Sequence, residues 1–323
     1  MPYTSIHGRR FGYNDNGLLF DGRPVGADPQ AYGFGNTFYV DSGVAGSDGT
    51  SPSTALATLE AAINKCTADQ GDLIIILPGH AESIASATAL NFDVGGIRIE
   101  GLGEGANRPT FTFTTANTAT IPVSANGITI RNCIFVGNFL SIASCFTVAA
   151  AADFWIDQCV FRDTDATHGF LSIVTTTVSV NSDGLRYTNN QRKSDATTSP
   201  GPDIVIANTM SRLKVHYNKS VHTVASNNVA ALIEHGALVM TDAEVIGNFV
   251  YSVNTDTATG AVLLKTTATT GSGIVASNRV RTLDAAAAIL VPVAAVQYAM
   301  FDNLHNDGAT FTSGYLLPAV GAD

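Results

Sequence analysis

The residues best suited to chemistry in this sequence are a short run of carboxylates with one histidine. Asp157, Asp163 and Asp165 precede His168 and form the densest group of this kind. Two convergent carboxylates can act as general acid and base on a glycosidic bond, and a larger set can hold Ca²⁺. The following segment offers different side chains at the equivalent positions: Asn189, Asn190 and Arg192. The group is therefore interpreted as a solvated corner.

A second group contains the same residue types, and its carboxylates are no closer together in the expected repeat than those of the first group: Glu234, His235, Asp242 and Glu244. His80 and Glu82 follow Pro78-Gly79 in the segment PGHAES. Metal binding or acid–base chemistry there is one reading, but a Pro-Gly turn that Glu82 anchors explains the same residues. The sequence thus predicts no catalytic residue, no metal site and no cofactor.

Charge and hydropathy narrow the choice of partners. The 323 residues carry a formal net charge of −10, and the one local basic cluster, Arg9-Arg10, is followed by Asp15 and Asp21. A nucleic-acid partner would require a basic stripe, so we expect none. No window approaches eighteen uninterrupted apolar residues, and the first residues lack the apolar core of a secretory signal. We expect no membrane partner and synthesis in a cytoplasm.

Four cysteines are too few and too scattered for a disulfide framework: Cys66, Cys133, Cys145 and Cys159. They form no CxxC motif that would suggest zinc. Cys133 and Cys159 occupy the same position of a repeat, where stacking would permit a bridge. We favour two buried thiols, because the expected compartment is reducing.

That repeat is the strongest signal in the sequence. A β-rich stretch is followed by Asn or a close substitute and then by a second β-rich stretch, at spacings of 26, 32, 28, 30, 30 and 25 residues. Asn tolerates a left-handed corner, and its side chain can hydrogen-bond an Asn one rung away. We therefore expect one column of corner residues: Asn132, Gln158, Asn190 (or Asn189), Asn218, Asn248, Asn278 and Asn303.

The repeat predicts an all-β, single-stranded parallel β-helix, or solenoid. A β-sandwich or propeller fits less well, since its strands recur every 8–12 residues or in four-strand blades. Apolar residues on one helical face predict a capping helix over 54–67: Leu56, Leu59, Ile63 and Cys66. The expected organisation is an extended arm at 1–38, a strand plus capping helix at 39–70, and a β-helix with a C-terminal cap at 71–323.

Two segments resemble a known family. FYVDSGVAGSDGTSPSTALATLEAAINKCTADQGDLIIILPGHAESI (38–84) and GLGEGANRPTFTF (101–113) resemble the opening of phage-encoded pectate-lyase-like β-helix proteins. The resemblance implies the right-handed form of the helix. Its version with a short Gly/Arg/aromatic arm and the PGHAES corner is most similar to proteins encoded among phage head genes.

The resemblance implies a virion structural protein that decorates the capsid surface as a β-helical trimer. Because so few carboxylates converge, we expect that it is not an enzyme, with a polysaccharide lyase or glycoside hydrolase as the less favoured alternative. Its expected partners are other copies of itself and the major capsid protein or other virion proteins. The alternative is a tail spike or tail fibre that binds or depolymerises a polysaccharide, with a host surface glycan as ligand. A secreted lyase or carbohydrate-binding domain fits less well, because no signal segment is evident.

The arm carries the residues that we expect to anchor the protein to the particle. Large apolar side chains among many glycines require a surface to cover them. The expected anchoring set combines these with the local basic pair: Arg9, Arg10, Phe11, Tyr13, Phe20, Tyr32 and Phe34. The covering surface is a capsid subunit or a neighbouring copy. In the alternative, the arm folds back onto its own rod.

Overall fold

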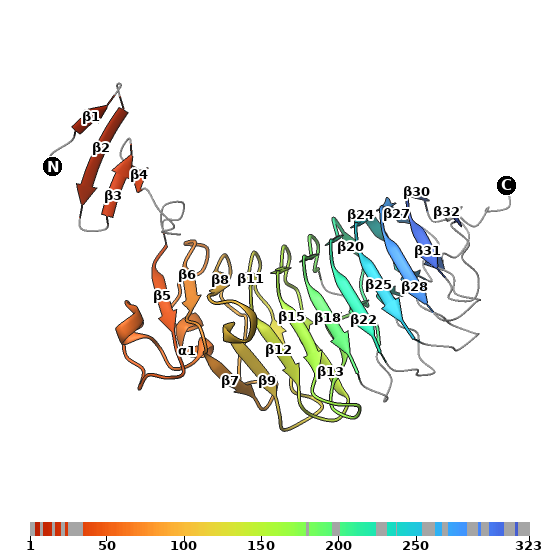
Figure 1. Ribbon diagram of the computed structural model, residues 1–323, viewed down its shortest axis with the longest axis horizontal. Coiled ribbons are helices and arrows are strands. Elements are labelled where there is room, and N and C mark those ends of the chain that lie inside the picture. The colour runs from red at the N-terminus through yellow and green to blue at the C-terminus, as the bar shows by residue number, and fades with distance from the viewer. Residues whose placement is uncertain are drawn as a thin grey trace.

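The computed structural model describes most of the chain. The described residues are 4–6, 9–14, 17–20, 23–24, 35–178, 181–195, 201–223, 231–236, 238–253, 262–266, 271–282, 290–291, 297–306 and 314–315. They form a long rod of stacked β-rungs, preceded by a small separate sheet (Figure 1).

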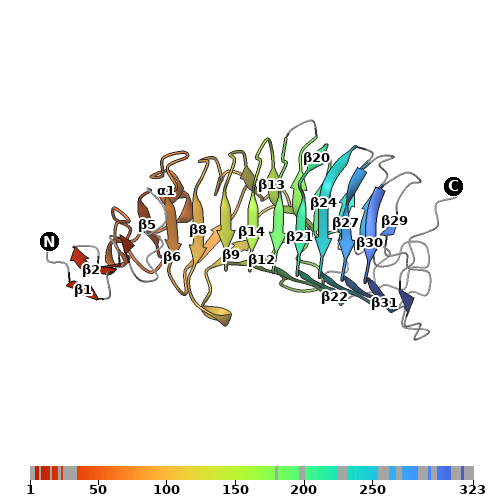
Figure 2. The same cartoon turned by 90° about the horizontal axis from the view of Figure 1, so that it is seen from above.

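Each rung contributes strands to three parallel sheets, which we number here. Sheet 1 contains β5 (Thr37–Val40), β6 (Leu73–Ile76), β8 (Arg98–Gly101), β11 (Thr129–Arg131), β14 (Trp155–Asp157), β17 (Arg186–Thr188), β21 (Lys214–His216), β24 (Met240–Ile246), β27 (Gly271–Ala276) and β30 (Gln297–Phe301), with β20 (Met210–Ser211) beside β24. Figure 2 shows the strands of sheet 1 side by side along the rod, from β6 to β30.

Sheet 2 lies across a sharp corner from sheet 1. It contains β7 (Ala81–Ile84), β9 (Thr110–Phe113), β12 (Ile134–Gly137), β15 (Val160–Asp163), β18 (Gln191–Ser194), β22 (Lys219–His222), β25 (Phe249–Ser252), β28 (Arg279–Thr282), β31 (Leu304–Asn306) and β32 (Gly314–Tyr315). The final pair, β31 and β32, is antiparallel, unlike the other pairs of this sheet.

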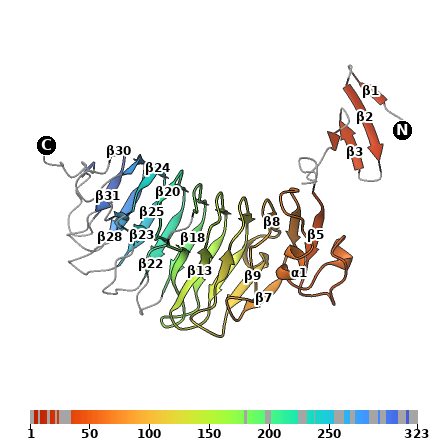
Figure 3. The ribbon, with the colours of Figure 1, turned by 180° about the vertical axis from the view of Figure 1, so that it is seen from behind.

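Sheet 3 completes the rungs. It contains β10 (Ile121–Val123), β13 (Ile142–Val148), β16 (Phe170–Thr176), β19 (Ile204–Ile206), β23 (Ala231–His235), β26 (Val262–Thr266) and β29 (Leu290–Val291). Figure 3 shows the rungs from behind, following one another from β5 to β31. The predicted fold class, an all-β right-handed parallel β-helix, is confirmed.

The interior of the rod is a continuous apolar core. Strand residues alternate between the core and the surface, as in β9, where Phe111 and Phe113 are fully buried. The parallel register places equivalent side chains above one another. Phe135 stacks on Phe111 and on Phe161, with ring centroids 5.5 and 5.2 Å apart, and Tyr187 continues the stack at 6.1 Å. Such offset stacks add to the burial energy of the aromatic rings.

The corner between sheets 1 and 2 has two columns of residues, which the sequence pattern merged into one. In the outer column the residues have positive φ: Asn132, Gln158, Asn189, Tyr217, Gly247, Ser277 and Asp302. In the inner column Asn190, Asn218, Asn248, Asn278 and Asn303 are buried. In the first four of these five residues the backbone N–H donates to the side-chain Oδ1 of the next Asn, as from Asn218 to Asn248 at 2.9 Å.

The expected place of Asn132 and Gln158 in the Asn column is therefore wrong by one residue. Cys133 and Cys159 hold the inner positions of those two rungs, and the Cys159 N–H donates to Asn190 Oδ1 at 2.9 Å. At this corner the first residue adopts the left-handed conformation, and the residue after it is buried, in most rungs with its backbone N–H bonded to an Asn side chain of the next rung. Two consecutive residues therefore have different structural roles. The prediction of two buried thiols is confirmed, since Cys133 and Cys159 are free and fully buried.

The N-terminal end of the rod differs from prediction in two ways. The parallel ladder begins at β5, which pairs with β6, and so starts before residue 71. The expected helix over 54–67 is limited to α1 (Leu59–Ile63), preceded by the 3-10 turn η2 (Pro52–Thr54). The Thr58 side chain caps the N-terminus of α1. Leu56 forms a parallel β-bridge with Val40 and is therefore not part of the helix.

The segment expected to be an extended arm contains an antiparallel sheet. Its strands are β1 (Thr4–Ile6), β2 (Arg9–Asn14), β3 (Gly17–Phe20) and β4 (Arg23–Pro24), in sequential order. Alternating residues around the Asn14–Gly17 hairpin explain the pairing, in which Phe11 lies opposite Phe20. Among the described helices, none is long and apolar enough to cross a membrane.

Candidate functional site

The densest carboxylate group of the sequence does not converge. Asp157 is buried on sheet 1 and accepts hydrogen bonds from Arg131 Nε at 2.8 Å and Thr188 Oγ1 at 2.6 Å. Asp163 is buried and accepts from Ser194 Oγ at 2.8 Å. These two are structural groups rather than the expected solvated corner. Hydrogen-bond donors of the protein already engage both carboxylates, so Asp157 and Asp163 do not form a pair that faces a substrate.

Asp165 alone fits the expected solvated corner. It accepts hydrogen bonds from the backbone and hydroxyl of Thr167 and from the backbone of His168, at 2.7, 2.8 and 2.9 Å. The backbone N–H and then the hydroxyl of Thr167, followed by the His168 side chain, lower the pKa of this carboxyl. The group is thus a self-contained turn.

The other two predicted groups also serve the fold. Glu234 pairs with Lys265 at 3.2 Å, whereas Glu244 pairs with Lys214 at 3.0 Å on a different sheet. Glu82 Oε2 accepts from the Leu59 backbone N–H at 2.9 Å and lies 3.2 Å from His80 Nε2. Glu82 therefore fastens the capping helix to the first rungs. Within the described residues no three potential ligands are placed to hold a metal ion.

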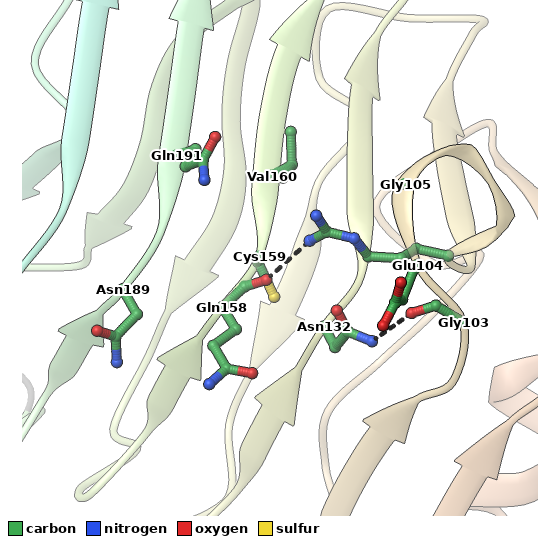
Figure 4. Close-up of a pocket in the computed structure, with 10 residues that line it drawn as sticks. Gly103, Glu104, Gly105, Asn132, Gln158, Cys159, Val160, Asn189 and Gln191 are labelled. Atoms are coloured by element: carbon green, nitrogen blue, oxygen red, sulfur yellow. Dashed lines mark hydrogen bonds between the residues drawn. The ribbon is translucent and has the colours of Figure 1, made fainter.

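A pocket of about 380 Å³ lies at the corner between sheets 1 and 2. Figure 4 shows Glu104, Gly103 and Asn132 on one side of it and Asn189 and Gln191 on the other. We call it the amide pocket, and its lining comes from four neighbouring segments: Gly103, Glu104, Gly105, Arg108, Asn132, Gln158, Cys159, Val160, Asn189 and Gln191.

The wall of the amide pocket is a tight loop between β8 and β9. It contains the 3-10 turn η3 (Gly105–Asn107). Gly103 has φ of +100°, and a Cβ there would lie 2.6 Å from the Asn107 carbonyl oxygen, so only glycine fits. Asn132 Nδ2 holds the loop by donating to the carbonyls of Gly101 at 2.8 Å and Gly103 at 3.1 Å. The loop is thus fixed to the corner column.

The floor and opposite wall present amides at the spacing of the rungs. Arg108 Nη1 donates to the Gln158 carbonyl at 3.2 Å, which holds the guanidinium at the pocket. Asn189 Nδ2 donates to Asp157 Oδ1 at 2.8 Å. The side chains of Gln158, Gln191 and Glu104 have no hydrogen bond within the described part of the chain, and all three are exposed. They are available to a ligand.

This set can recognise hydroxyl groups and move a proton. A side-chain amide offers donors and an acceptor, a combination that matches neighbouring hydroxyls of a sugar ring. Glu104 is the one carboxylate in the lining, and Arg108 supplies a fixed positive charge. In the sequence, Asn132, Gln158 and Asn189 stood out only as corner residues, and Glu104 and Arg108 only as part of GLGEGANRPTFTF (101–113).

A second hollow, of about 410 Å³, continues the amide pocket over sheet 2. The two share Val160 and Gln191. The continuation is lined by β15, β18 and β22: Val160, Arg162, Gln191, Arg192, Lys193, Lys219 and Val221. The exposed members of its lining are mainly cationic, whereas the amide pocket is mainly neutral.

The predicted anchoring residues lie elsewhere. Arg9, Arg10, Phe11 and Tyr13 are in β2, and Phe20 is in β3. Tyr32 and Phe34 fall outside the described residues. The anchoring role of this set stays a prediction.

Comparisons with known proteins extend the fold assignment. No family model matches the chain, and no curated protein matches it. Among solved structures, the chain is similar to a rhamnogalacturonan lyase, with a TM-score of 0.51 and 12% identity, over 77% of this chain and 69% of that one. A mutant of Bacillus subtilis pectate lyase aligns at a TM-score of 0.39 and 10% identity, over 89% of this chain and 87% of that one.

The first of these likenesses supports a lyase-like parallel β-helix. It also corrects the expectation that the chain is not an enzyme. That expectation rested on the missing carboxylate cluster, whereas the chain shares its architecture with a protein named for polysaccharide cleavage. A carboxylate count along the sequence was too narrow a criterion, because a lone carboxylate with a fixed cation can also move protons.

Proposed function

We propose that this protein binds and acts on a polysaccharide in the amide pocket, and that it does so on the surface of a phage virion. The observation that carries the proposal is the pocket itself, whose lining includes the Glu104 carboxylate and the Gln158 and Gln191 amides, which make no hydrogen bond to other described residues. The name of the similar rhamnogalacturonan lyase supports a polysaccharide as the class of ligand.

The arrangement of the amides suits a chain of sugars. Gln158 and Asn189 occupy the same corner column on successive rungs, so their backbones are about 4.8 Å apart. Neighbouring hydroxyls of one sugar, or hydroxyls of two linked sugars, can engage such a ladder. Pockets of this size enclose small ligands and bury most of their surface.

Glu104 is the residue that we assign to proton transfer. In a β-elimination, Glu104 removes a proton from the sugar-ring carbon next to the one that carries the departing oxygen. A ring double bond forms as that C–O bond breaks, and the protonated Glu104 returns the proton to the departing oxygen. Arg108, held by the Gln158 carbonyl at 3.2 Å, lies in the same lining and stabilises negative charge that develops there. Glu104 touches the substrate in this scheme, and Arg108 acts electrostatically.

Binding and cleavage are tested with two matched pairs of variants. Gln158→Asn shortens one pocket amide and keeps a residue that tolerates positive φ, while Gln70→Asn makes the same change at an exposed site. Glu104→Gln removes the pocket carboxylate, and Asp93→Asn neutralises an exposed carboxylate elsewhere. The probes are a panel of neutral and acidic bacterial capsular polysaccharides, assayed by calorimetry and by the appearance of new chain ends.

We expect Gln158→Asn to weaken binding about three- to tenfold, the value of one net hydrogen bond, and Gln70→Asn to leave it unchanged. Glu104→Gln should bind but no longer release chain ends, and Asp93→Asn should behave as the wild type. The proposal fails if no polysaccharide binds, or if each variant matches its control.

The virion location rests on the resemblance of 38–84 and 101–113 to phage proteins. A trimer attached through residues 1–38 to the major capsid protein or another virion protein is the form that we propose. An available glycan pocket favours a surface that meets the host, whether on the capsid or on a tail spike. Mass spectrometry of purified particles, with and without deletion of residues 1–35, tests this. The deletion stops before β5 and should release a folded rod, and retention of the shortened protein on particles would refute the anchor.

A further inference from the structure

The outer face of sheet 2 carries several positively charged side chains, although the protein has a net charge of −10. Two lines of outward residues run along the rod. In one, Gln191, Lys219, Phe249 and Arg279 are successive partners on β18, β22, β25 and β28. In the other, the successive partners are Arg162, Lys193, Val221, Tyr251 and Arg281. We call the five basic residues of the two lines the cationic strip.

Three of the five cations of this strip lack the carboxylate partners that basic residues of sheet 1 have among the described residues. Lys193 is 2.6 Å from Asp195, and the Arg281 guanidinium lies 5.4 Å from the Tyr251 ring centroid. Arg162, Lys219 and Arg279 have no carboxylate within 4 Å among the described residues. On sheet 1, by contrast, the cations are paired: Arg98 with Glu100, Arg131 with Glu100 and Asp157, and Lys214 with Glu244.

The close spacing of like charges along the cationic strip does not stabilise the fold. Arg162 and Lys193 are direct partners on adjacent strands, about 4.8 Å apart, and like charges at such positions repel. From β15 to β28 the strip crosses four strand steps, which gives it a length of roughly 19 Å. An anionic ligand lying along the rod would relieve this repulsion at several rungs at once.

We propose that the cationic strip binds a carboxylate-bearing polysaccharide that continues from the amide pocket along sheet 2. This inference rests on the proposed function and adds its substrate class, an acidic glycan. The path is continuous, because Gln191 belongs both to the pocket and to the hollow over Arg162 and Lys219. Guanidinium groups such as Arg162 and Arg279 can bind a carboxylate with two parallel hydrogen bonds.

The remaining side chains of the two lines favour a sugar chain over nucleic acid or a second copy. Phe249 is 36% exposed and Tyr251 is partly exposed, so both offer ring surface to the apolar face of a sugar. Gln191 adds hydrogen bonds to hydroxyls. Duplex DNA would demand a denser basic surface than these five cations provide.

The test compares three cations of the strip with three cations elsewhere. The strip variant is Arg162→Gln/Lys219→Gln/Arg279→Gln. The control variant is Lys65→Gln/Arg98→Gln/Arg212→Gln, with the same change of charge at exposed sites on other surfaces. The probes are alginate, carboxyl-reduced alginate and single-stranded DNA, with affinities measured at two salt concentrations.

We expect the wild type to bind alginate with an affinity that falls as salt rises, and to bind the carboxyl-reduced chain much more weakly. The strip variant should lose at least about tenfold in affinity, or 1.4 kcal/mol, and the control variant should match the wild type. Equal binding by the strip variant overturns the proposal. So does tighter binding of DNA that alginate does not displace, or a self-association that only the strip variant loses.

The outcome separates this inference from the proposed function. If the pocket variants Gln158→Asn and Glu104→Gln have no effect while the strip variant loses alginate, the strip stands and the pocket fails. If the reduced and unreduced chains bind alike, only Gln158→Asn weakens their binding and Glu104→Gln stops the release of chain ends, the pocket stands and the strip fails.

Discussion

Replacement of one buried asparagine should reveal how much the inner corner column contributes to stability. Asn248 is 1% exposed. Its Oδ1 accepts from Asn218 N and Nδ2, each at 2.9 Å, and its Nδ2 donates to the Val215 carbonyl at 2.8 Å and Asn278 Oδ1 at 2.9 Å. Asn248→Ala removes all four bonds and leaves their partners inside the rod.

The cost follows from the buried groups that lose a hydrogen-bond partner. Asn218 N loses its Asn248 acceptor and the Val215 carbonyl loses one donor, whereas Asn218 Nδ2 keeps its bond to the Tyr187 carbonyl and Asn278 Oδ1 keeps the Asn248 backbone N–H. At about 1–3 kcal/mol for a buried group left without a partner and about 1 kcal/mol for a further bond lost, the loss is about 3–5 kcal/mol once the cavity is included. At roughly 2 °C per kcal/mol for a large domain, Tm should fall by about 6–10 °C.

Calorimetry gives the shift in Tm, and hydrogen exchange should show loss of protection on the rungs of β21 to β27 (214–276) before the rest of the rod. Asn138→Ala is the matched control, because Asn138 is exposed and its side chain makes no hydrogen bond within the described residues. It should stay within about 0.5 kcal/mol of the wild type. If the two variants melt together, the column is not a source of stability and the reasoning is refuted.

Three other predictions concern titration, thiols and the pocket loop. Burial, and then the neighbouring Arg192 guanidinium, hold the pKa of His222 well below its usual 6.5, so the unfolded chain binds the proton first. The contribution of His222 to stability should be constant above pH 6.5 and fall below it, and denaturant titration should show a shallower fall for His222→Asn. Burial raises the pKa of the Cys66 thiol to about 12, and the three other thiols are fully buried. A thiol reagent should therefore label the native protein slowly and the unfolded protein at four sites, and fast labelling of the native protein would contradict this. Gly103→Ala should distort the amide pocket and weaken glycan binding. Gly105→Ala, where an added Cβ meets nothing within 4 Å, should reduce the affinity much less, and equal binding by both variants would show that the loop does not shape the pocket.

Several features followed from the sequence because they are local. Alternation along each strand sets which side chains enter the core, so the burial of Ile128 and Ile130 could be predicted from period 2 alone. A near-constant spacing of Asn residues was enough to indicate stacked rungs, because the same corner must recur at each turn. The prediction merged two neighbouring corner positions into one column. The sequence does not distinguish them, because Asn suits both a left-handed turn, as at Asn132, and a buried ladder, as at Asn218.

The site depended on register, which the sequence pattern does not determine. Arg108 meets the Gln158 carbonyl across fifty positions of the chain, and Gln191 reaches the same pocket from the next rung. Likewise, Arg162, Lys219 and Arg279 are far apart in a chain with a net negative charge, and they form a strip because parallel pairing aligns their strands. The sequence by itself determined the rung, since its geometry repeats locally; only the stacked structure decided which side chains share a surface, because a shift of one residue sends a side chain to the opposite face.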